Sequence, residues 1–131
     1  MENEIFLVSN HEFLLLAASV GIESLYGFDL QPELLEKQEA IYSLQELTSK
    51  GWLCVEHGTF FPTGKIQEIF KRIKNAETIV EVHKKSGKRC ILYISDCTIF
   101  VAESMRRNDM YEVSAYSTDD IWLNLQEEGW I

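Results

Sequence analysis

The feature that most constrains this fold is the stretch from Thr78 to Tyr116, which has the pattern of four consecutive short β-strands. It is rich in Val, Ile, Tyr, Phe and Thr, whose side chains suit a pleated, half-buried surface. Short connections such as Lys85-Ser86-Gly87 force neighbouring strands to run antiparallel, because a parallel pair requires a long crossover. The sequence therefore predicts an antiparallel meander. Its strands are expected at Thr78–Lys84, Lys88–Ser95, Thr98–Glu103 and Met110–Tyr116.

The two inner strands of this meander are apolar on both faces. Cys90, Leu92 and Ile94 point to one face of the second strand, and Ile91 and Tyr93 point to the other. An antiparallel sheet with one face in water shows polar alternation throughout instead. Both faces are therefore expected to be covered, either by helices of this chain or by a second subunit or partner.

The first 76 residues carry the signals of three helices and a hairpin, after an entry at Glu4–Val8 that suits a short strand or an extended chain. Ser9 with Glu12 three residues later is a capping-box pattern, and it predicts a helix that stops at Gly21. A loop or short irregular helix is expected at Ile22–Gln31. The next elements are expected at Pro32–Ser49 (helix), around His57-Gly58 (tight hairpin) and at Gly64–Asn75 (helix). Helix, helix, hairpin and helix is the order of a winged helix-turn-helix.

The predicted helix at Pro32–Ser49 has two distinct faces. An apolar stripe at helical spacing is expected to face the core, and it contains Leu34, Ile41, Leu44 and Leu47. A polar face is expected to lie in water, and it contains Glu36, Glu39, Ser43 and Glu46, with Lys50 as its only basic residue.

A final helix is expected after Ser117, which suits an N-cap with Asp120 as the third helical residue. The predicted fold is therefore α+β, in a single domain covering residues 1–131. Residues 1–76 form its winged-helix-like part. Residues 77–131 form a four-stranded antiparallel meander and the C-terminal helix.

The net charge of −9 is unevenly distributed along the chain. Residues 1–64 carry −8, residues 65–89 carry +5 and residues 90–131 carry −6. An acidic body with one basic band argues against general affinity for nucleic acids or anionic membranes. The acidic face at Glu36 and Glu39 would also repel a DNA groove, where a recognition helix needs cations or amides. We therefore expect neither specific nucleic-acid binding nor membrane binding.

No motif in the chain predicts a reaction. There is no phosphate-binding loop and no nucleophile elbow. Cys54 and His57 are close in sequence, but no second pair completes a zinc site. Cys54, Cys90 and Cys97 are expected to be reduced and mostly buried, with Cys54 an inert core thiol. We expect no enzyme activity, no cofactor and no metal. The acidic start and the lack of a long apolar run predict a cytoplasmic protein.

The predicted sheet and the last helix supply the candidate partner-binding residues. Aromatic rings are favoured at interaction hot spots, and neighbouring charges set the register of a partner. Trp122, Trp130 and Ile131 are a large apolar load near a chain end, so they are expected either to dock on the sheet or to form an interface. The candidate residues are Glu81, His83, Tyr93, Phe100, Glu112, Tyr116, Trp122 and Trp130.

Three segments together resemble one protein family. They are the leucine-rich helix at Glu12–Leu16, the segment EAIYSLQELTSKGWL at Glu39–Leu53 and the segment FFPTGKIQEIF at Phe60–Phe70, followed by the strand meander and a short helix. This order resembles the amino-terminal half of the EspG-type chaperones of type VII (ESX) secretion. The resemblance implies a cytosolic protein that holds a helical secretion substrate before export.

The leading function expected is therefore a non-enzymatic, cytoplasmic protein-binding module, a chaperone or adaptor for helical type VII secretion substrates. A homodimer that uses the last strand or the terminal helix is expected, because two copies would imitate the two related halves of that family. The alternative is a winged-helix transcriptional regulator or effector-sensing domain. A third reading is an assembly subunit whose only role is interaction.

Overall fold

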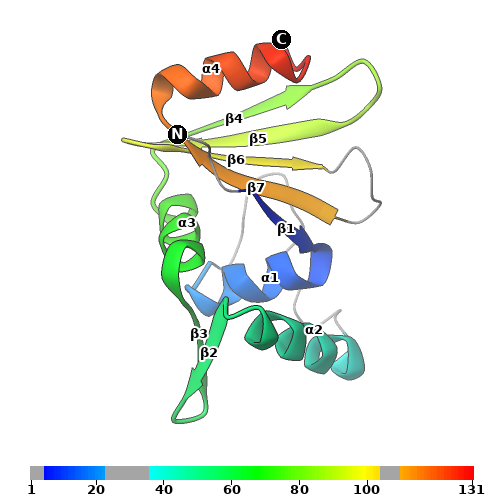
Figure 1. The fold of residues 1–131 in the computed structure, drawn as a ribbon, viewed down its shortest axis with the longest axis vertical. Helices are drawn as coiled ribbons and strands as arrows, with labels where there is room; N and C mark the ends of the chain where they lie inside the picture. Colours follow the sequence, from blue (N-terminus) through cyan, green and yellow to red (C-terminus); the bar gives the residue numbers. More distant parts are fainter. Residues whose placement is uncertain (1–4, 23–35, 104–109) are drawn as a thin grey trace. The chain divides into compact units, whose positions relative to one another are not determined.

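The computed structural model describes residues 5–22, 36–103 and 110–131 (Figure 1). Its elements confirm an α+β fold, and the chain divides into two compact units, Met1–Val8 with Asn75–Ile131, and Ser9–Lys74. The first unit contains β1 (Phe6–Ser9), β4 (Thr78–His83), β5 (Arg89–Ile94), β6 (Thr98–Glu103), β7 (Met110–Tyr116) and α4 (Thr118–Glu127). The second contains α1 (Asn10–Ser19), α2 (Lys37–Ser49), β2 (Leu53–Glu56), β3 (Thr59–Pro62) and α3 (Gly64–Lys74).

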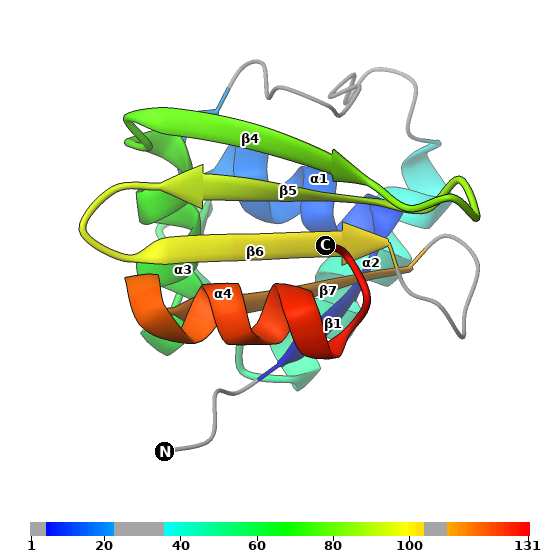
Figure 2. The ribbon, with the colours of Figure 1, turned by 90° about the horizontal axis from the view of Figure 1, so that it is seen from above.

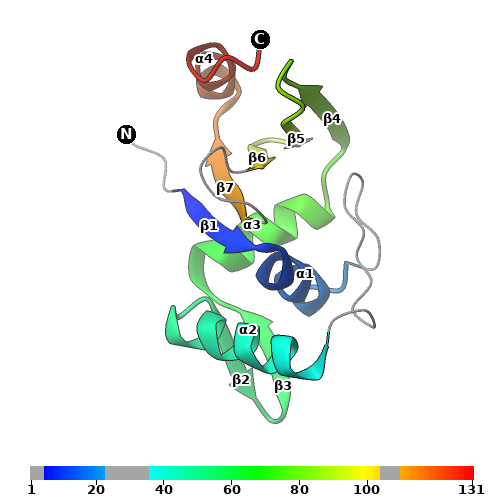
Figure 3. The same cartoon turned by 90° about the vertical axis from the view of Figure 1, so that its right-hand side faces the viewer.

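The main sheet has five strands in the order β1-β7-β6-β5-β4 (Figure 3). Strands β4 to β7 pair antiparallel in chain order, within one residue of the predicted bounds. The fifth strand, β1, lies beside β7, so the last strand of the chain is an interior strand. Strand β7 therefore has no free edge for pairing with a second copy, because β1 occupies its second edge, while the homodimer itself stays a prediction.

Helix α4 covers one face of the sheet, alongside β6 and β7 (Figure 2). The ladder register places Cys90, Leu92, Phe100 and Ala102 on this face. A buried core forms where these side chains meet Ile121, Leu125 and Trp130. The side chains of the opposite face are buried too, namely Ile91, Tyr93, Ile99, Val101 and Val113. The prediction that both faces are covered is thus confirmed.

The C-terminal end of α4 turns the chain back onto this core. Gly129 has a φ of 77°, a conformation that costs other residues strain, and the Trp130 N–H donates to the Leu125 carbonyl at 2.8 Å. This turn brings the Trp130 ring edge-on to Phe100, with ring centroids 6.2 Å apart. Of the three apolar residues near the chain end, Trp130 is docked, whereas Trp122 and Ile131 are exposed.

In the Ser9–Lys74 unit, the predicted capping box begins α1. The Glu12 N–H donates to Ser9 Oγ at 3.1 Å, and the Ser9 N–H donates to Glu12 Oε1 at 2.9 Å. The other carboxylate oxygen of Glu12 accepts a hydrogen bond from Lys50 Nζ at 2.8 Å, which compensates the buried charge. Phe13 and Phe70 join α1 to α3, with ring centroids 5.3 Å apart.

Helix α2 begins later than predicted. Glu36 has an extended backbone, with a ψ of 146°, and serves as the N-cap, so the helix runs from Lys37. The prediction of one continuous helix from Pro32 is therefore wrong at Glu36. The other predictions for residues 23–35, a loop through Gln31 and a first turn at Pro32, lie outside the described residues.

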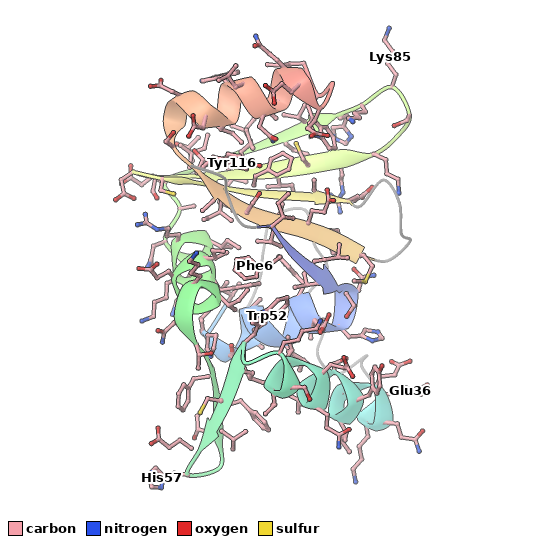
Figure 4. All side chains as sticks on the ribbon, in the orientation of Figure 1. Phe6, Glu36, Trp52, His57, Lys85 and Tyr116 are labelled. Carbon is pink, nitrogen blue, oxygen red and sulfur yellow. The ribbon has the colours of Figure 1, made fainter. Side chains whose placement is uncertain are left out.

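The predicted hairpin at His57-Gly58 is confirmed. Both residues have positive φ, 51° and 76°, which is typical of a type I′ turn and matches the twist of two paired strands. The pairing runs from Leu53 opposite Pro62 to Glu56 opposite Thr59. His57 lies at the tip of this hairpin (Figure 4).

The two tryptophans of the C-terminal segment provide a matched pair of substitutions. Trp130→Ala is expected to lower the free energy of unfolding by about 3 kcal/mol or more, because removing a buried ring leaves a cavity. Trp122→Ala is expected to change it by less than about 0.5 kcal/mol, since that ring is 57% exposed. Urea unfolding followed by circular dichroism measures both. Equal effects of the two substitutions would contradict the docking of Trp130.

Candidate partner-binding surfaces

The exposed surface between α2 and the β2–β3 hairpin is apolar. Ile41 lies on the outer side of α2 and is 45% exposed, although its spacing predicted a core position. The buried face of α2 instead contains Ser43 and Leu47, which are four residues apart and so lie above one another. The prediction that Ser43 belongs to the polar face is wrong, because Ser43 lies on the buried face. The buried face of α2 is therefore turned about the helix axis relative to the predicted apolar stripe, and Ile41 lies at the surface.

Ile41 and Phe60 lie on the wall of an open groove of about 730 Å³. The described residues that line it are Ile41, Leu44, Gln45, Glu46, Thr48, Ser49 and Phe60. Val55 is directly opposite Phe60 across the hairpin, so the two side chains share one face and the apolar surface continues toward the tip. Tyr42 is more exposed than Ile41 but does not line the groove.

The charged side chains around α2 are mostly acidic or already paired. Glu46 is the one charged residue among the described residues that line the groove. Lys50 is bonded to Glu12, and its ammonium group lies 4.8 Å from the centre of the Trp52 ring. His11 lies 3.6 Å from Glu39. The groove therefore combines an apolar floor with a polar, weakly acidic rim.

A second concavity lies under α4, in the sheet unit. It measures about 260 Å³, and its lining includes three aromatic rings together with Glu112, Ser114 and Asn124. Phe100, Tyr116 and Trp130 supply these rings, and Tyr116 packs edge-on to Phe100 with centroids 6.1 Å apart. Figure 4 shows Tyr116 between α4 and the sheet.

Two contacts limit what this concavity can hold. Lys84 Nζ donates to the Glu128 carbonyl at 2.7 Å and lies 4.5 Å from the centre of the Trp130 ring. Tyr116 Oη donates to Asn124 Oδ1 at 3.3 Å, while Asn124 Nδ2 is buried without a hydrogen-bond partner among the described residues. Ligand pockets are usually about 300–1,000 Å³. The volume is below that range, and the space suits ordered water better than a ligand.

Glu81 and His83 lie on the other face of the sheet. Arg89 Nη1 is 2.9 Å from Glu81 Oε1, and Arg89 Nε is 3.1 Å from Glu103 Oε1, so one guanidinium joins three strands. Burial lowers the pKa of Arg89, but its bonds to the two carboxylates raise it by more, and the net shift is upward. His83 Nε2 lies 3.6 Å from Glu81 Oε2. Glu81 is therefore part of an internal ion-pair network.

The eight predicted partner-binding residues are thus divided between several environments. Four of them meet at the concavity under α4, namely Phe100, Glu112, Tyr116 and Trp130. The rings of Tyr93, Phe100 and Trp130 are buried in the core, so these three do not present an exposed surface to a partner. The alternation of the strands predicted cover on both faces, but it did not predict which of the rings would be buried. Trp122 is exposed on α4, so its ring is accessible to a partner.

The apolar groove residues and the exposure of one cysteine were not predicted from the sequence. Cys54 is exposed, and the prediction of an inert core thiol is wrong because only Leu53 of strand β2 is buried. The exposure of Phe60 and Val55 could have been predicted from the sequence, since a hairpin of four-residue strands cannot bury apolar side chains along its whole length. Among the described residues, no cluster of His, Cys, Asp or Glu is suited to hold a metal ion. None of the helices described in the structure has the length and apolarity to cross a bilayer.

Comparison with known proteins gives no relative: no family model, no curated protein and no solved structure matches this chain.

The three thiols are expected to react in the order of their exposure. Cys54 is exposed and should be modified first by a thiol reagent, and the half-buried Cys97 should follow more slowly. Burial raises the pKa of the Cys90 thiol to about 12, partly offset by the charge of Lys84, so Cys90 stays protonated and unreactive. Mass spectrometry of peptides after timed labelling of the folded protein measures the three rates. Modification of Cys90 at the rate of Cys54 would contradict the packing of α4 on the sheet.

Proposed function

We propose that this protein is a non-enzymatic protein-binding module in which the groove between α2 and the hairpin receives an amphipathic helix of a partner. The observation that carries the proposal is the exposure of Ile41 and Phe60 on the walls of one groove. Isolated apolar residues on a surface are ordinary, but a groove with an apolar floor and a polar rim is typical of interaction sites.

The chemistry of the groove supports a helical occupant. Ile41 and Leu44 are three residues apart on α2, and they form one apolar row that faces Phe60. A helix with apolar residues at positions i, i+3 and i+4 complements such a groove. Glu46 on the rim favours a partner helix with a basic residue beside its apolar stripe.

The resemblance to EspG-type chaperones connects this mode of binding to type VII secretion. A helical secretion substrate carries an apolar stripe that must be covered before export. We propose that the protein acts in the cytoplasm as a chaperone or adaptor for such substrates. In this proposal, residues 9–74 are a winged-helix-like module with the hairpin as its wing. The sheet is a four-stranded meander extended by β1.

The alternative function, a winged-helix transcriptional regulator, is favoured by one observation. Helix α3 exposes Lys65, Lys71 and Lys74 in a basic band. Lys74 Nζ, however, donates to the Val20 carbonyl at 2.9 Å within the same unit. The exposed residues Glu36 and Glu39 on α2 oppose entry into a DNA groove. This alternative is therefore the weaker proposal.

Specific DNA binding is expected to be absent. Fluorescence anisotropy with the DNA upstream of the gene, at about 0.15 M salt, should give no sequence-dependent binding near 10⁻⁸ M, the usual range of specific complexes. A scrambled duplex of equal length is the control. Tighter binding to the upstream sequence than to the scrambled one would favour the regulator over the chaperone.

The groove is tested by two neighbouring substitutions on α2. Helical proteins encoded near this gene are co-expressed with the protein, and the affinity of any complex is measured by calorimetry. Ile41→Glu is expected to weaken binding at least tenfold, because it puts a charge on the apolar wall of the groove. Tyr42→Glu is expected to leave the affinity nearly unchanged, since Tyr42 is exposed outside the groove.

The two variants also separate binding from folding. Both residues are exposed on the same helix, so both variants should keep the circular dichroism spectrum and unfolding midpoint of the unmodified protein. Failure of all neighbouring helical proteins to bind would oppose the proposed function. Equal loss of affinity in the two variants would move the binding site away from the groove.

A further inference from the structure

The outer edge of β4 has the properties of an interface. Strand β4 is the terminal strand of the sheet, and no strand of the described residues pairs with its second edge. The residues from Glu77 to Val80 are exposed. Ile79 and Val80 point to opposite faces of the sheet and are 41% and 38% exposed. An edge that is apolar on both faces is a template for pairing with another strand.

Edge strands of monomeric proteins are usually protected against such pairing. Common devices are a very short strand, a bulge, a proline or a lysine within the strand. The other edge strand, β1, has only four residues, of which Phe6 and Val8 are buried. Strand β4 has six residues without proline or lysine, and its pairing with β5 runs unbroken from Thr78 to His83. Its one carboxylate, Glu81, lies 2.9 Å from Arg89 and is neutralised inside the sheet.

We propose that the β4 edges of two copies of this chain pair antiparallel about a two-fold axis, joining two five-stranded sheets into one continuous sheet. A two-fold contact uses the same patch on both copies, so one exposed edge is sufficient. The inference goes beyond the proposed function, since the groove lies in the other compact unit. Either proposal can fail without the other.

Strand length and charge together select the register of this pairing. Only a two-fold centred on Val80 or on Glu81 pairs five of the six residues of β4 with β4 of the second copy. A two-fold centred on Glu81 puts this carboxylate opposite its own copy, and like charges directly opposite each other destabilise a strand pair. A two-fold centred on Val80 puts Val80 opposite itself, Ile79 opposite Glu81, and Thr78 opposite Val82. This register has no like-charge pair within β4.

The backbone of β4 is compatible with this register. The Lys84 N–H donates to the Lys88 carbonyl at 2.8 Å, so Lys84 and Lys88 form a hydrogen-bonded pair. Because N–H groups alternate in direction along a strand, Val80 bonds toward β5 and Ile79 points its N–H to the outer edge. Val80 would then form a non-hydrogen-bonded pair with its copy. In such pairs the Cα atoms are about 4.5 Å apart.

This short separation permits a specific crosslinking test. A disulfide requires Cα atoms about 4.4–6.8 Å apart, a condition that Val80 meets with its copy in the proposed register. In a Cys54→Ser background, which removes the exposed thiol, Val80→Cys is expected to form a covalent dimer under mild oxidation. Ile79→Cys is the matched control. It lies opposite Glu81 of the second copy, so it is expected to form far less dimer.

Sedimentation equilibrium tests the pairing without a crosslink. The unmodified protein is expected to sediment as a dimer, with twice the 15.2 kDa mass of one chain. Val80→Lys is expected to give the monomer mass, because it places two ammonium groups opposite each other on the axis. Ile79→Pro is expected to do the same, since it removes an edge donor and spares the β4–β5 bonds. Val55→Lys, at an exposed valine of the hairpin, is the control and should stay dimeric.

Circular dichroism of each variant checks that the fold is retained. A monomeric unmodified chain would overturn the proposal. This holds also if the edge of β4 then binds an extended peptide of another protein instead of a second copy. A dimer that survives both Val80→Lys and Ile79→Pro would overturn it as well, because the interface would then lie elsewhere. Equal crosslinking of the variants Ile79→Cys and Val80→Cys would overturn the register.

Discussion

The register of the antiparallel ladder from β4 to β7 decides which side chains meet in the sheet unit. Side chains alternate with a period of two, so a slip of one residue would exchange the two faces along a whole strand. In the observed register Leu92 is opposite Phe100, and both lie under α4 with Trp130. The same register places Arg89 where it reaches carboxylates on β4 and β6. The core, the ion-pair network and the exposed edge of β4 all depend on this alternation.

Helix caps connect local sequence to this packing. Glu12 serves two purposes, since one carboxylate oxygen closes the capping box of α1 and the other binds Lys50 at the end of α2. Gly51 and Gly129 end α2 and α4 with the same turn, in which the second residue after the cap donates back to the helix. In both cases that residue is a tryptophan. Trp52 lies near Lys50 and Trp130 near Lys84, so each turn also builds a cation–π contact.

The sequence predicted the helices and strands of this fold better than it predicted their long-range pairing and the burial of their side chains. Strands, caps and the hairpin follow from local patterns, and they were found within one or two residues. The pairing of β1 with β7 was not predictable, because it joins segments far apart in the chain and β1 has only four residues. The prediction of the candidate site was the least accurate. A pattern shows that Tyr93 and Ile41 are apolar, but burial depends on neighbours, and the structure buries Tyr93 and exposes Ile41.

The position of β1 has a consequence for how the chain is made. Strand β1 leaves the ribosome early, but its partner β7 follows roughly 100 residues later. At about 5–20 residues per second, this delay is on the order of 5–20 s. The Ser9–Lys74 unit is complete well before that, and it can fold while the sheet is still being synthesised. Until β1 docks, β7 is itself an open edge, so the nascent sheet passes through a stage in which association with other chains competes with its own completion.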